Sequence, residues 1–495
     1  MRSIGKISRP ATFCCLILLM IVACPDGGKQ SRKDSNTKGS QNVEGVNKAV
    51  SYMFSGLGGG KAVEVCKNRL LVTTTKKVED MPKKLRNDVV VNNKKIPVFV
   101  DTETISSPGR SGKSIYMVTQ NNPKITPEGF YGSMLLEFSA DIETDVEPDF
   151  VIRPPKMKPV PLTTNLPPDW WKEHIDTMRV LNHNKVNLRR NVVVAVLDSG
   201  LNYNNDALKD NVWKAPAGGF PSGIQPNCPV NTVGVDFTVG PPSCDPATTF
   251  GHGNWVAGVI AANGGLFGNG SERIKILPVK VIEDELGCLS FAIQGLNFIR
   301  DINASSISPN IVVVNMSIGC GDPTNAFKTA VKAAAYAGLL IIASAGDENK
   351  NLNPGTENHH YPASMPKSTV LSVAASWGTD DQKLPSSNFG KKQVDVSAPG
   401  SGIGTVDLNG DPLMNFSRTS AAAPVVSAAA SLLHAICREP GPGDTPSKWN
   451  TKLRSCIRNG TVRDPTVFGY VETGGINVFK AAERCRCIEP FFATP

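Results

Sequence analysis

The sequence has no run of lysine and arginine dense enough to mark a nucleic-acid surface, although its 495 residues carry a net charge of +8. Proteins that bind DNA or RNA gather basic residues along one face or helix, so the dispersed excess predicts a solvated surface and no nucleic-acid partner. The sequence also lacks cysteine pairs at the C-x-x-C spacing of zinc sites, and its C-x-C pair, Cys485 and Cys487, is a weak metal signal. Beyond the N-terminus no stretch is a convincing membrane span.

The N-terminus has the pattern of a targeting segment. Arg2, Lys6 and Arg9 precede the apolar run FCCLILLMIVAC, which is too short to span a bilayer comfortably and ends in small residues. This order predicts a secretory signal peptide over residues 1–24. The segment IVAC also fits a bacterial lipoprotein cleavage box, so a lipid anchor at Cys24 is the minor alternative. We therefore expect a protein that is secreted or held in a secretory organelle, with no stable membrane span.

Export places the cysteines in an oxidising compartment, where disulfide bonds are the rule. Cys66 stands alone between the signal region and an even set of eight for which disulfides are expected. That set is Cys228, Cys244, Cys288, Cys320, Cys437, Cys456, Cys485 and Cys487. Its pairing cannot be deduced from sequence alone, although Cys228 and Cys244 bracket one loop and are natural partners. Sequons at Asn269, Asn303 and Asn459 predict glycan sites if the host is eukaryotic.

Four segments of different composition follow residue 24. Residues 25–63 are polar and lack an apolar period, which predicts a flexible spacer. Residues 64–155 contain the strand-like runs NRLLVTTT, IPVFVD, SIYMVTQ, MLLEFSA and VEPDFVI, which predict a small α+β domain. Residues 156–172 are rich in proline and predict an extended, exposed linker with a processing site.

Residues 173–495 form the fourth segment, in which continuous apolar runs alternate with helical stretches. NVVVAVLD, IVVVNMSIG and LLIIASAG are examples of the apolar runs, and AFKTAVKAAAYAG is an example of a helical stretch. Short β-branched strands between longer helices predict an α/β fold, with a mainly parallel central sheet covered by helices on both faces. The functional residues of such sheets lie at the carboxyl ends of the strands.

Three polar residues stand at strand ends or helix starts. Asp198 ends a buried strand, His252 lies between two glycines before a helix, and Ser420 lies where a polar loop turns into the apolar helix AAAPVVSAAASLL. Taken singly, they read as a turn, an exposed histidine and a helix N-cap. Taken together and in this order, they fit a nucleophile, its general base and the residue that orients the base.

These motifs resemble those of the subtilisin-like serine proteases, peptidase family S8. AVLDSG resembles the family's Asp motif, GHGNWVAGVIAA its His motif and RTSAAAPVVSAAASLL its Ser motif. The resemblance covers about residues 160–480, and LNYNNDALKDNVW is most similar to protozoan, apicomplexan-type branches. It implies a serine endopeptidase that hydrolyses protein and peptide substrates through an acyl-enzyme.

The resemblance also implies a role for each site residue. Ser420 would attack the scissile carbonyl, His252 would take and return the proton, and Asp198 would hold the imidazole and stabilise the imidazolium. The Ser420 N–H would supply one oxyanion donor. The substrate backbone would pair with the segment Ser317, Ile318 and Gly319 as an added strand. Glu348 and His360 would line the first subsite, which permits either a polar or a narrowed pocket.

The chain departs from the family pattern near these residues. Asp347 occupies the position at which the family usually has an asparagine that donates to the oxyanion; an ionised carboxylate cannot donate, but a protonated one can. Asn349, two residues on, is a poorer substitute. Arg418 replaces the usual glycine before Thr-Ser and would either neutralise Asp347 or narrow the first subsite. Ala421 replaces the methionine that commonly follows the nucleophile.

The resemblance also assigns roles outside the catalytic motifs. IETDVEPDFVI resembles the last strand of the family's inhibitory prodomain, so residues 64–155 would be the enzyme's own inhibitor, cut off between Arg153 and Trp171. No cofactor is required. The expected calcium ligand is displaced to Asp206, so a structural calcium site would be weak or absent. The alternative to an active protease is a pseudoprotease that binds extended peptides or inhibitors without turnover.

Overall fold

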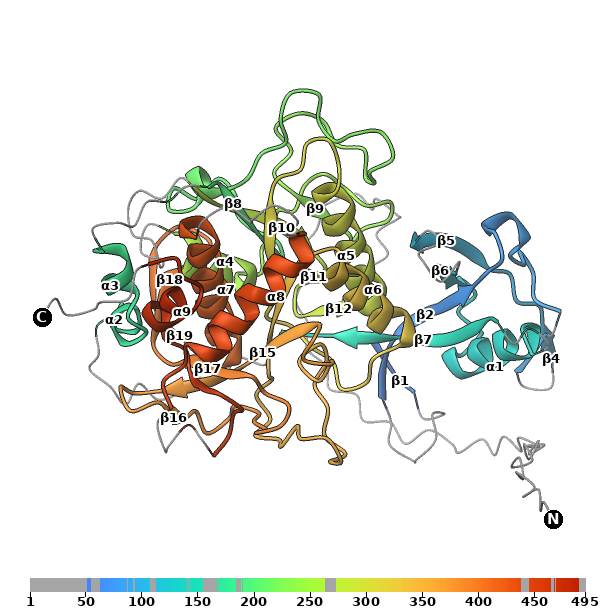
Figure 1. The fold of residues 1–495 in the computed structure, drawn as a ribbon. Coiled ribbons are helices and arrows are strands. Elements are labelled where there is room, and N and C mark those ends of the chain that lie inside the picture. The colour runs from blue at the N-terminus through green and yellow to red at the C-terminus, as the bar shows by residue number, and fades with distance from the viewer. Residues whose placement is uncertain are drawn as a thin grey trace, which may run out of the picture. The chain divides into compact units, whose positions relative to one another are not determined.

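The computed structural model describes the following residues: 51–54, 63–86, 88–91, 94–106, 113–139, 141, 143–154, 167, 169–183, 188, 190–262, 273–437, 445–463, 467 and 469–488. The predicted signal peptide, the Cys24 alternative and most of the proline-rich linker lie outside these residues. We call the described residues up to 154 the N-terminal domain and those from 169 onward the α/β domain (Figure 1).

A parallel sheet forms the centre of the α/β domain. In spatial order its strands are β20 (Gly474–Gly475), β17 (Val396–Pro399), β15 (Val370–Trp377), β14 (Leu340–Ser344), β13 (Ile311–Met316), β8 (Val192–Asp198), β10 (Ile274–Lys280) and β9 (Val235–Asp236). All these neighbours pair in parallel, and only the short β16 (Gln382–Lys383) runs antiparallel, against β15. The predicted mainly parallel sheet is therefore confirmed.

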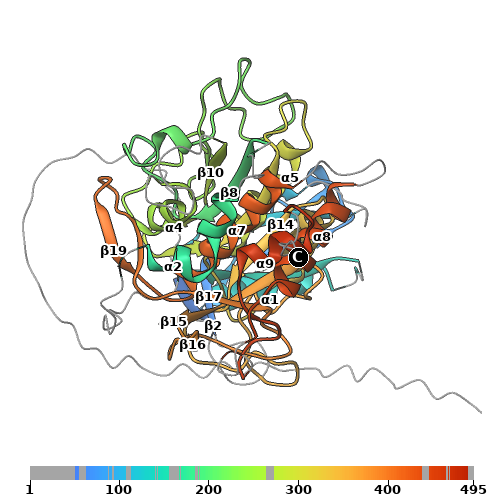
Figure 2. The same ribbon diagram turned by 60° about the vertical axis from the view of Figure 1, so that its left-hand side comes forward.

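Helices cover both faces of this sheet. One face holds α4 (His252–Ala261) and α7 (Thr419–Ile436), and the other holds α5 (Leu289–Asn303) and α6 (Asn325–Tyr336). Figure 2 shows β8 between α4 and α5. Every second residue of β8 from Val192 packs with α4 and α7, whereas the intervening ones from Val193 pack with α5 and α6. Burial on both faces explains why the strand reads as a continuous apolar run.

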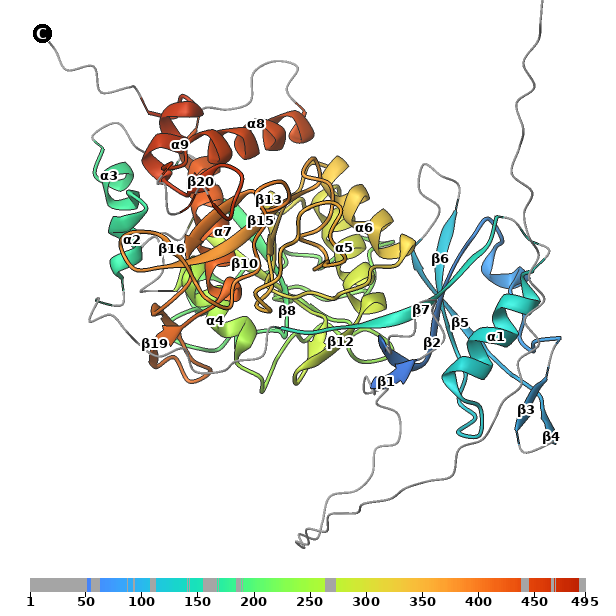
Figure 3. The ribbon, with the colours of Figure 1, turned by 90° about the horizontal axis from the view of Figure 1, so that it is seen from below.

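Helix α7 is long and apolar enough to cross a membrane by composition, but all of it is buried inside the protein. A helix that is apolar all round is buried in a large core as readily as in a bilayer. Short elements complete the α/β domain: α2 (Trp170–His174), α3 (Thr177–Leu181), η2 (Lys209–Asn211), β18 (Ile403–Val406), β19 (Pro412–Phe416), α8 (Pro446–Asn459) and α9 (Val478–Arg484). Helices α8 and α9 lie beside one another (Figure 3).

The N-terminal domain is an antiparallel sheet with one described α-helix. Its strands are β1 (Ser51–Phe54), β2 (Val63–Thr74), β5 (Asp101–Ser106), β6 (Ser114–Thr119) and β7 (Asp145–Ile152), with a separate pair β3 (Val89–Val91) and β4 (Lys94–Ile96) and the turn η1 (Val78–Asp80). Strand β1 lies inside residues 25–63, so the predicted spacer ends earlier than expected. The sheet continues into the α/β domain, because β7 pairs with β12 (Leu286–Cys288), which pairs with β11 (Ile282–Glu283).

The prediction of a strand for the run MLLEFSA is wrong, because this run begins in a helix. Its first four residues end helix α1 (Pro127–Glu137), which packs against β2 and β7 (Figure 3). The Thr126 side chain accepts a hydrogen bond from the Gly129 N–H at 3.1 Å, and Pro127 occupies the first helical position. A capping threonine followed by proline is a helix-start signal that outweighs the short apolar run.

Four disulfides cross-link the described residues. Cys228–Cys244 is the predicted pair, whereas Cys437–Cys487 and Cys456–Cys485 connect the end of α7 and α8 to the end of α9. The C-x-C cysteines therefore belong to two different disulfides and are not metal ligands. The fourth bond joins Cys66 to Cys288, and Cys320 is the described cysteine left without a disulfide. The expectation of disulfides throughout the set of eight is thus wrong for Cys320.

Candidate active site

Asp198 and His252 lie together at the carboxyl edge of the central sheet. Asp198 is the last residue of β8 and His252 is the first of α4, and both side chains are fully buried. The His252 Nδ1 atom lies 2.8 Å from Asp198 Oδ1. The Ser199 N–H donates to the same oxygen at 2.8 Å, so the carboxylate is held in place on both sides.

Glycines allow the two segments to approach so closely. Gly200 has φ +89°, and an ideal Cβ placed on it would lie 2.2 Å from the Pro246 carbonyl oxygen. A Cβ on Gly253 would lie 2.0 Å from the Gly200 carbonyl oxygen. A side chain at Gly253 would therefore separate the start of α4 from the turn after β8, and one at Gly200 would separate that turn from the segment at Pro246. This explains why Asp198 and His252 are each followed closely by glycine.

Aromatic rings surround the imidazole of His252. The ring of Phe250 stacks at a centroid distance of 6.3 Å, and those of Trp255 and Phe416 approach edge-on at 6.1 and 6.0 Å. The His252 Nε2 atom is buried and has no hydrogen-bond partner among the described residues. Because Nδ1 faces Asp198, the neutral tautomer protonated at Nδ1 leaves Nε2 with a free lone pair. The site thus holds an unpartnered base.

Ser420 is the second residue of α7. Its Oγ atom donates to the Ser317 carbonyl oxygen at 3.2 Å, so no hydrogen bond to His252 is formed in this arrangement. In proteases without substrate such contacts are often long and tighten only on binding. The Ser420 N–H has no hydrogen-bond partner among the described residues. It belongs to the first turn of a helix, where N–H groups lack intrahelical acceptors.

A proline within α7 leaves the Ser420 carbonyl oxygen free to contact the segment that follows β13. Pro424 has no N–H, so it cannot bond the carbonyl oxygen of Ser420 four residues earlier. That carbonyl instead accepts from the Ser317 Oγ at 3.1 Å. Asn315 donates to the same Ser317 Oγ at 3.0 Å and accepts from the Ser427 hydroxyl at 2.8 Å. These contacts fix the start of α7 against the segment that follows β13.

Asp347 faces Thr419, the residue before Ser420. Its carboxylate accepts from the Thr419 N–H at 3.1 Å and from the Thr419 hydroxyl at 2.9 Å. Burial raises the pKa of Asp347 to about 6, against the opposing effect of the Thr419 hydrogen bonds and the Arg418 charge. Asn349 is exposed and accepts from the Lys383 ammonium at 2.9 Å, so it lies away from this position.

The predicted substrate segment already carries an extended chain. Arg153, just beyond β7, donates its N–H to the Gly319 carbonyl oxygen at 3.1 Å and accepts from the Gly319 N–H at 3.0 Å. This is a hydrogen-bonded antiparallel pair, the contact that an added substrate strand makes. Ser317 and Ile318, which precede Gly319, are both buried. The three residues thus lead from this pair to the carbonyl that Ser420 contacts.

His360 lies between two backbone segments of the predicted first subsite. An ideal Cβ on Gly319 would lie 2.1 Å from His360 Nε2, and one on Gly346 would lie 2.6 Å from Nδ1. The imidazole therefore fills the space between these glycines. Its Nδ1 lies 3.9 Å from Glu348 Oε2, and burial lowers the pKa of His360, which favours the neutral ring. Of the two alternatives for the predicted first subsite, the structure therefore favours a pocket narrowed by the neutral side chain of His360.

Asn388 is a site residue that the sequence did not indicate. Its Oδ1 accepts from the N–H groups of Glu348 and Lys350, and its Nδ2 donates to the Glu348 carboxylate at 2.6 Å and to the Ala345 carbonyl at 2.9 Å. It therefore fixes the loop that carries Asp347 and Glu348. Because it lies 40 residues from Glu348, no local motif connects the two.

The described residues give little support for calcium. Asp206 is exposed and its carboxylate is paired with the Lys209 ammonium at 2.5 Å. A carboxylate neutralised by lysine does not fit the oxygen-rich cluster that calcium requires. Asn269 lies outside the described residues. Of the other two sequons, Asn459 is exposed at the end of α8, whereas Asn303 holds the Ile311 backbone through both side-chain atoms.

Comparisons with known proteins show which chains this one is similar to. The model of the subtilase family, Peptidase_S8, matches residues 189–470, more than half of the chain. Subtilisin-like protease 6 of Arthroderma benhamiae is 35% identical over 199 residues, covering 39% of this chain and 45% of the relative. Subtilisin amylosacchariticus of Bacillus subtilis subsp. amylosacchariticus is 31% identical over 238 residues, covering 47% of this chain and 56% of the relative. The chain thus spans about half the length of such curated relatives.

A solved structure shows the same fold. The crystal structure of fervidolysin from Fervidobacterium pennivorans, described as a keratinolytic enzyme related to subtilisin, superposes with a TM-score of 0.60 at 20% sequence identity. The match covers 88% of this chain and 63% of that chain. At this identity the likeness concerns the fold alone. The relatives named here are fungal and bacterial, so the similarity of LNYNNDALKDNVW to protozoan branches stays a prediction.

Proposed function

The chain belongs to the subtilase family, and from this premise we propose that it is a secreted serine endopeptidase made as a zymogen. The observation that carries the proposal is the buried pair of Asp198 and His252 with an unpartnered Nε2 atom, on the same side of the sheet as Ser420. A fully buried histidine without a partner at Nε2 is costly unless the site uses that atom.

Acyl transfer begins when Ser420 Oγ attacks the scissile carbonyl. The hydroxyl turns from the Ser317 carbonyl to His252, whose Nε2 takes the proton as the bond to carbon forms. Asp198 stabilises the imidazolium through Nδ1. His252 then protonates the leaving amine, the C–N bond breaks and the acyl-enzyme remains. Water repeats the sequence and releases the acid product.

The developing oxyanion needs hydrogen-bond donors at the start of α7. The free N–H of Ser420 is one such donor, and the positive end of the helix dipole adds to it. Asp347 supplies a second donor only when protonated, because an ionised carboxylate has no hydrogen to give. Its pKa of about 6 implies that this donor is largely lost at neutral pH.

The N-terminal domain acts as the enzyme's own prodomain in this proposal. Its Glu147 accepts from the N–H groups of Asn325 and Ala326 at 2.8 and 3.2 Å, in the first turn of α6. Its Asp149 accepts from the Ser290 N–H and hydroxyl at 2.9 and 2.6 Å, in the first turn of α5. Carboxylates stabilise helix N-termini, so the domain supports folding of the α/β domain. The Arg153–Gly319 pair explains how it also blocks substrate.

A fluorophosphonate probe, which reacts with activated serines, tests the proposal on secreted protein, with dithiothreitol present to separate any fragments that a disulfide still joins after the linker is cut. Labelling of the wild type that is lost in Ser420→Ala, reduced in Asp198→Asn and kept in the control Ser401→Ala is expected. N-terminal sequencing should also show that Ser420→Ala is not cut between Arg153 and Trp171. Processed protein that is neither labelled nor able to cleave casein would favour the pseudoprotease, for which Asp347 is the specific argument.

A further inference from the structure

The Cys66–Cys288 disulfide connects the N-terminal domain to the α/β domain. In the sequence, one of its cysteines precedes the linker and the other follows it. Cys66 lies in β2 of the N-terminal domain, and Cys288 ends β12 directly before α5. The bond spans 222 residues of sequence and has an S–S distance of 2.05 Å. Every peptide bond between Arg153 and Trp171 lies between these cysteines. A cut in this interval therefore leaves one cysteine on each fragment, and the fragments remain joined.

We propose that this disulfide is a covalent tether that retains the prodomain after the linker is cut, so that full activation also requires a thiol reductant. The inference rests on the proposed function for its effect on activity, but the tether itself does not. A fragment held at its site by a tether has an effective concentration of about millimolar, and its retention exceeds that of a free fragment by about 10²- to 10⁴-fold. Dilution of the cut protein therefore does not release the prodomain from the substrate-binding segment.

The contacts around the bond protect it while the domains are docked. Cys66 is 1% exposed and Cys288 is 0% exposed. Cys288 also pairs with Val151 of β7 in the antiparallel ladder between β7 and β12. A thiolate must reach a sulfur atom to attack it, so reduction requires this ladder to open. Cutting the linker frees the end of β7 and makes that opening easier. We therefore expect the disulfide to be reduced after the linker has been cut.

The reductant is a dithiol or a low-molecular-weight thiol. A thiolate attacks one sulfur of the pair, the S–S bond breaks, and the released cysteine thiolate takes up a proton. A second thiolate attacks the mixed disulfide, which frees the other cysteine and oxidises the reductant to its own disulfide. In an oxidising secretory compartment the tether persists. The enzyme therefore becomes fully active only where reducing thiols are present.

The tether is tested first without any protease activity of the chain. In the Ser420→Ala background, a recognition sequence for an unrelated site-specific protease replaces residues 157–164, and the purified full chain is cut there. Gel electrophoresis in denaturant is expected to show one band without reductant and two with it. Cys66→Ser in the same background is expected to give two bands in both lanes. Two bands from the cut Ser420→Ala chain without reductant would overturn the proposal.

The effect on activity is tested with self-processed wild type at nanomolar concentration. Dithiothreitol is expected to raise peptide hydrolysis, and Cys66→Ser with Cys288→Ser is expected to be fully active without it. Cys228→Ser with Cys244→Ser removes a disulfide within the α/β domain and should keep the thiol dependence. Equal wild-type activity with and without thiol would overturn the activation step. If every variant is inactive but the cut Ser420→Ala chain gives one band without reductant, the result would contradict the proposed function and still support the tether.

Discussion

Both carboxylate oxygens of Asp347 accept hydrogen bonds from Thr419, the residue directly before Ser420, the proposed nucleophile. The backbone N–H lies at 3.1 Å and the hydroxyl at 2.9 Å. The Thr419 hydroxyl in turn accepts from the Gly346 N–H at 3.2 Å. Asp347 thus acts as a carboxylate cap on the first turn of α7, a role that favours the charged form. Oxyanion stabilisation needs the opposite form, so the two roles compete at this side chain.

Asp347→Asn separates these roles. An asparagine keeps an oxygen for the Thr419 N–H and gains a permanent donor, so kcat at pH 8 is expected to rise by up to about 10²-fold with little change in KM. The gain should shrink as pH falls through about 6, because Asp347 then becomes protonated and can donate. Peptide hydrolysis from pH 5 to 9 provides the measurement. Asp210→Asn, which removes an exposed carboxylate elsewhere, is the control and should change neither parameter.

The position of His360 predicts the cleavage preference. Residues opposite one another in an antiparallel pair project to the same face, so a substrate residue paired with Gly319, and the residues two positions away on either side of it, would point to the side where a Gly319 Cβ would be. His360 occupies that side. The wild type is therefore expected to cleave best after glycine, alanine or serine, which need little space.

His360→Gly should open this pocket. For peptides with leucine at the cleavage position, kcat/KM is expected to rise by about 10- to 10²-fold, as pockets discriminate by roughly this factor per added group. His359→Ala, on the exposed neighbour, should leave the preference unchanged. The measurement is a peptide series that varies the residue supplying the scissile carbonyl. A wild type that already prefers leucine or phenylalanine would contradict this assignment.

The sequence predicted those parts of the site that depend on local pattern. A buried strand ending in Asp198 and a glycine-flanked His252 at a helix start need only the rule that parallel strands end at one edge. Contacts between distant segments could not be predicted in this way. Asp347 and Thr419 lie 72 residues apart, and either side chain alone looks ordinary. The position of His360 between two glycines likewise depends on how three loops pack.

The two errors in the N-terminal domain have different origins, one local and one long-range. Met134 and its apolar neighbours fit either a strand or the end of a helix, and Thr126 with Pro127 decides between them. Cys66 looked unpaired because its partner Cys288 belongs to another domain, and sequence spacing carries no signal of that contact. Composition thus carried no signal of how the N-terminal domain connects to the α/β domain.

Arg418 adopts a backbone conformation that glycine favours. Its φ is +90° and its ψ is −173°. A residue with a Cβ in such a region costs about 1–3 kcal/mol, which explains the glycine usual at this position. Arg418→Gly is therefore expected to be more stable than Arg418→Ala by about 1 kcal/mol, because both lose the guanidinium and only one keeps a Cβ. Urea unfolding in the Ser420→Ala background, which prevents self-digestion, gives the comparison.

The Arg418→Gly substitution also tests whether the Arg418 charge affects the pKa of Asp347. The Arg418 charge lowers the pKa of Asp347, so its removal should raise that pKa further above the ordinary aspartate range. The pH below which the gain from Asp347→Asn disappears should then move upward in the Arg418→Gly background. An unchanged pH profile would show that the guanidinium is too far away, or too well screened, to influence the oxyanion donor.

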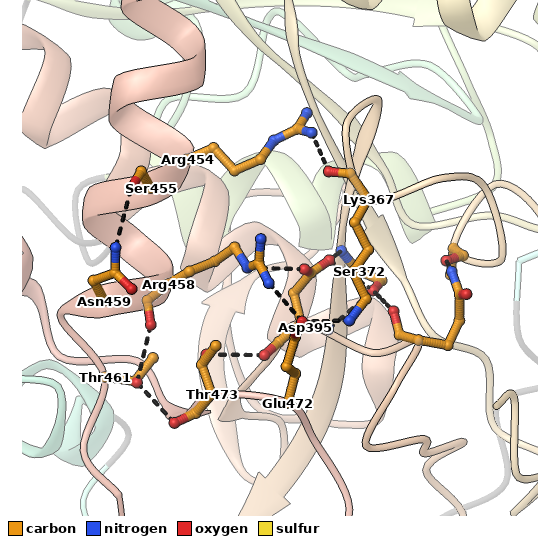
Figure 4. Close-up of polar contacts among 12 residues, drawn as sticks. Lys367, Ser372, Asp395, Arg454, Ser455, Arg458, Asn459, Thr461, Glu472 and Thr473 are labelled. Carbon is orange, nitrogen blue, oxygen red and sulfur yellow. Dashed lines mark hydrogen bonds and ion pairs between the residues drawn. The ribbon is translucent and has the colours of Figure 1, made fainter. Parts of the chain in front are cut away.

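The last prediction concerns the attachment of α8 to the central sheet (Figure 4). Arg458 reaches from α8 to Asp395, beside β17, with Nε 3.1 Å from Oδ1, and also contacts Glu472. Asp395 is fully buried, and burial raises its pKa. Arg458→Met removes the cation that directly contacts this carboxylate, and removal of one partner of a buried pair costs about 3–5 kcal/mol.

The pH dependence distinguishes a lost charge pair from lost packing. Because the folded-state pKa of Asp395 lies above its unfolded value, stability falls as pH rises through that interval, and losing Arg458 should widen it. The destabilisation by Arg458→Met, measured by urea unfolding in the Ser420→Ala background, should therefore be larger at pH 8 than at pH 4. Lys367→Met removes a cation that contacts the more exposed Glu472 and acts on Asp395 less strongly than Arg458 does, so it should cost less, about 1 kcal/mol. Adding Asp395→Asn to Arg458→Met should recover most of the loss at pH 8, and a double variant as unstable as the single one would show that packing dominates.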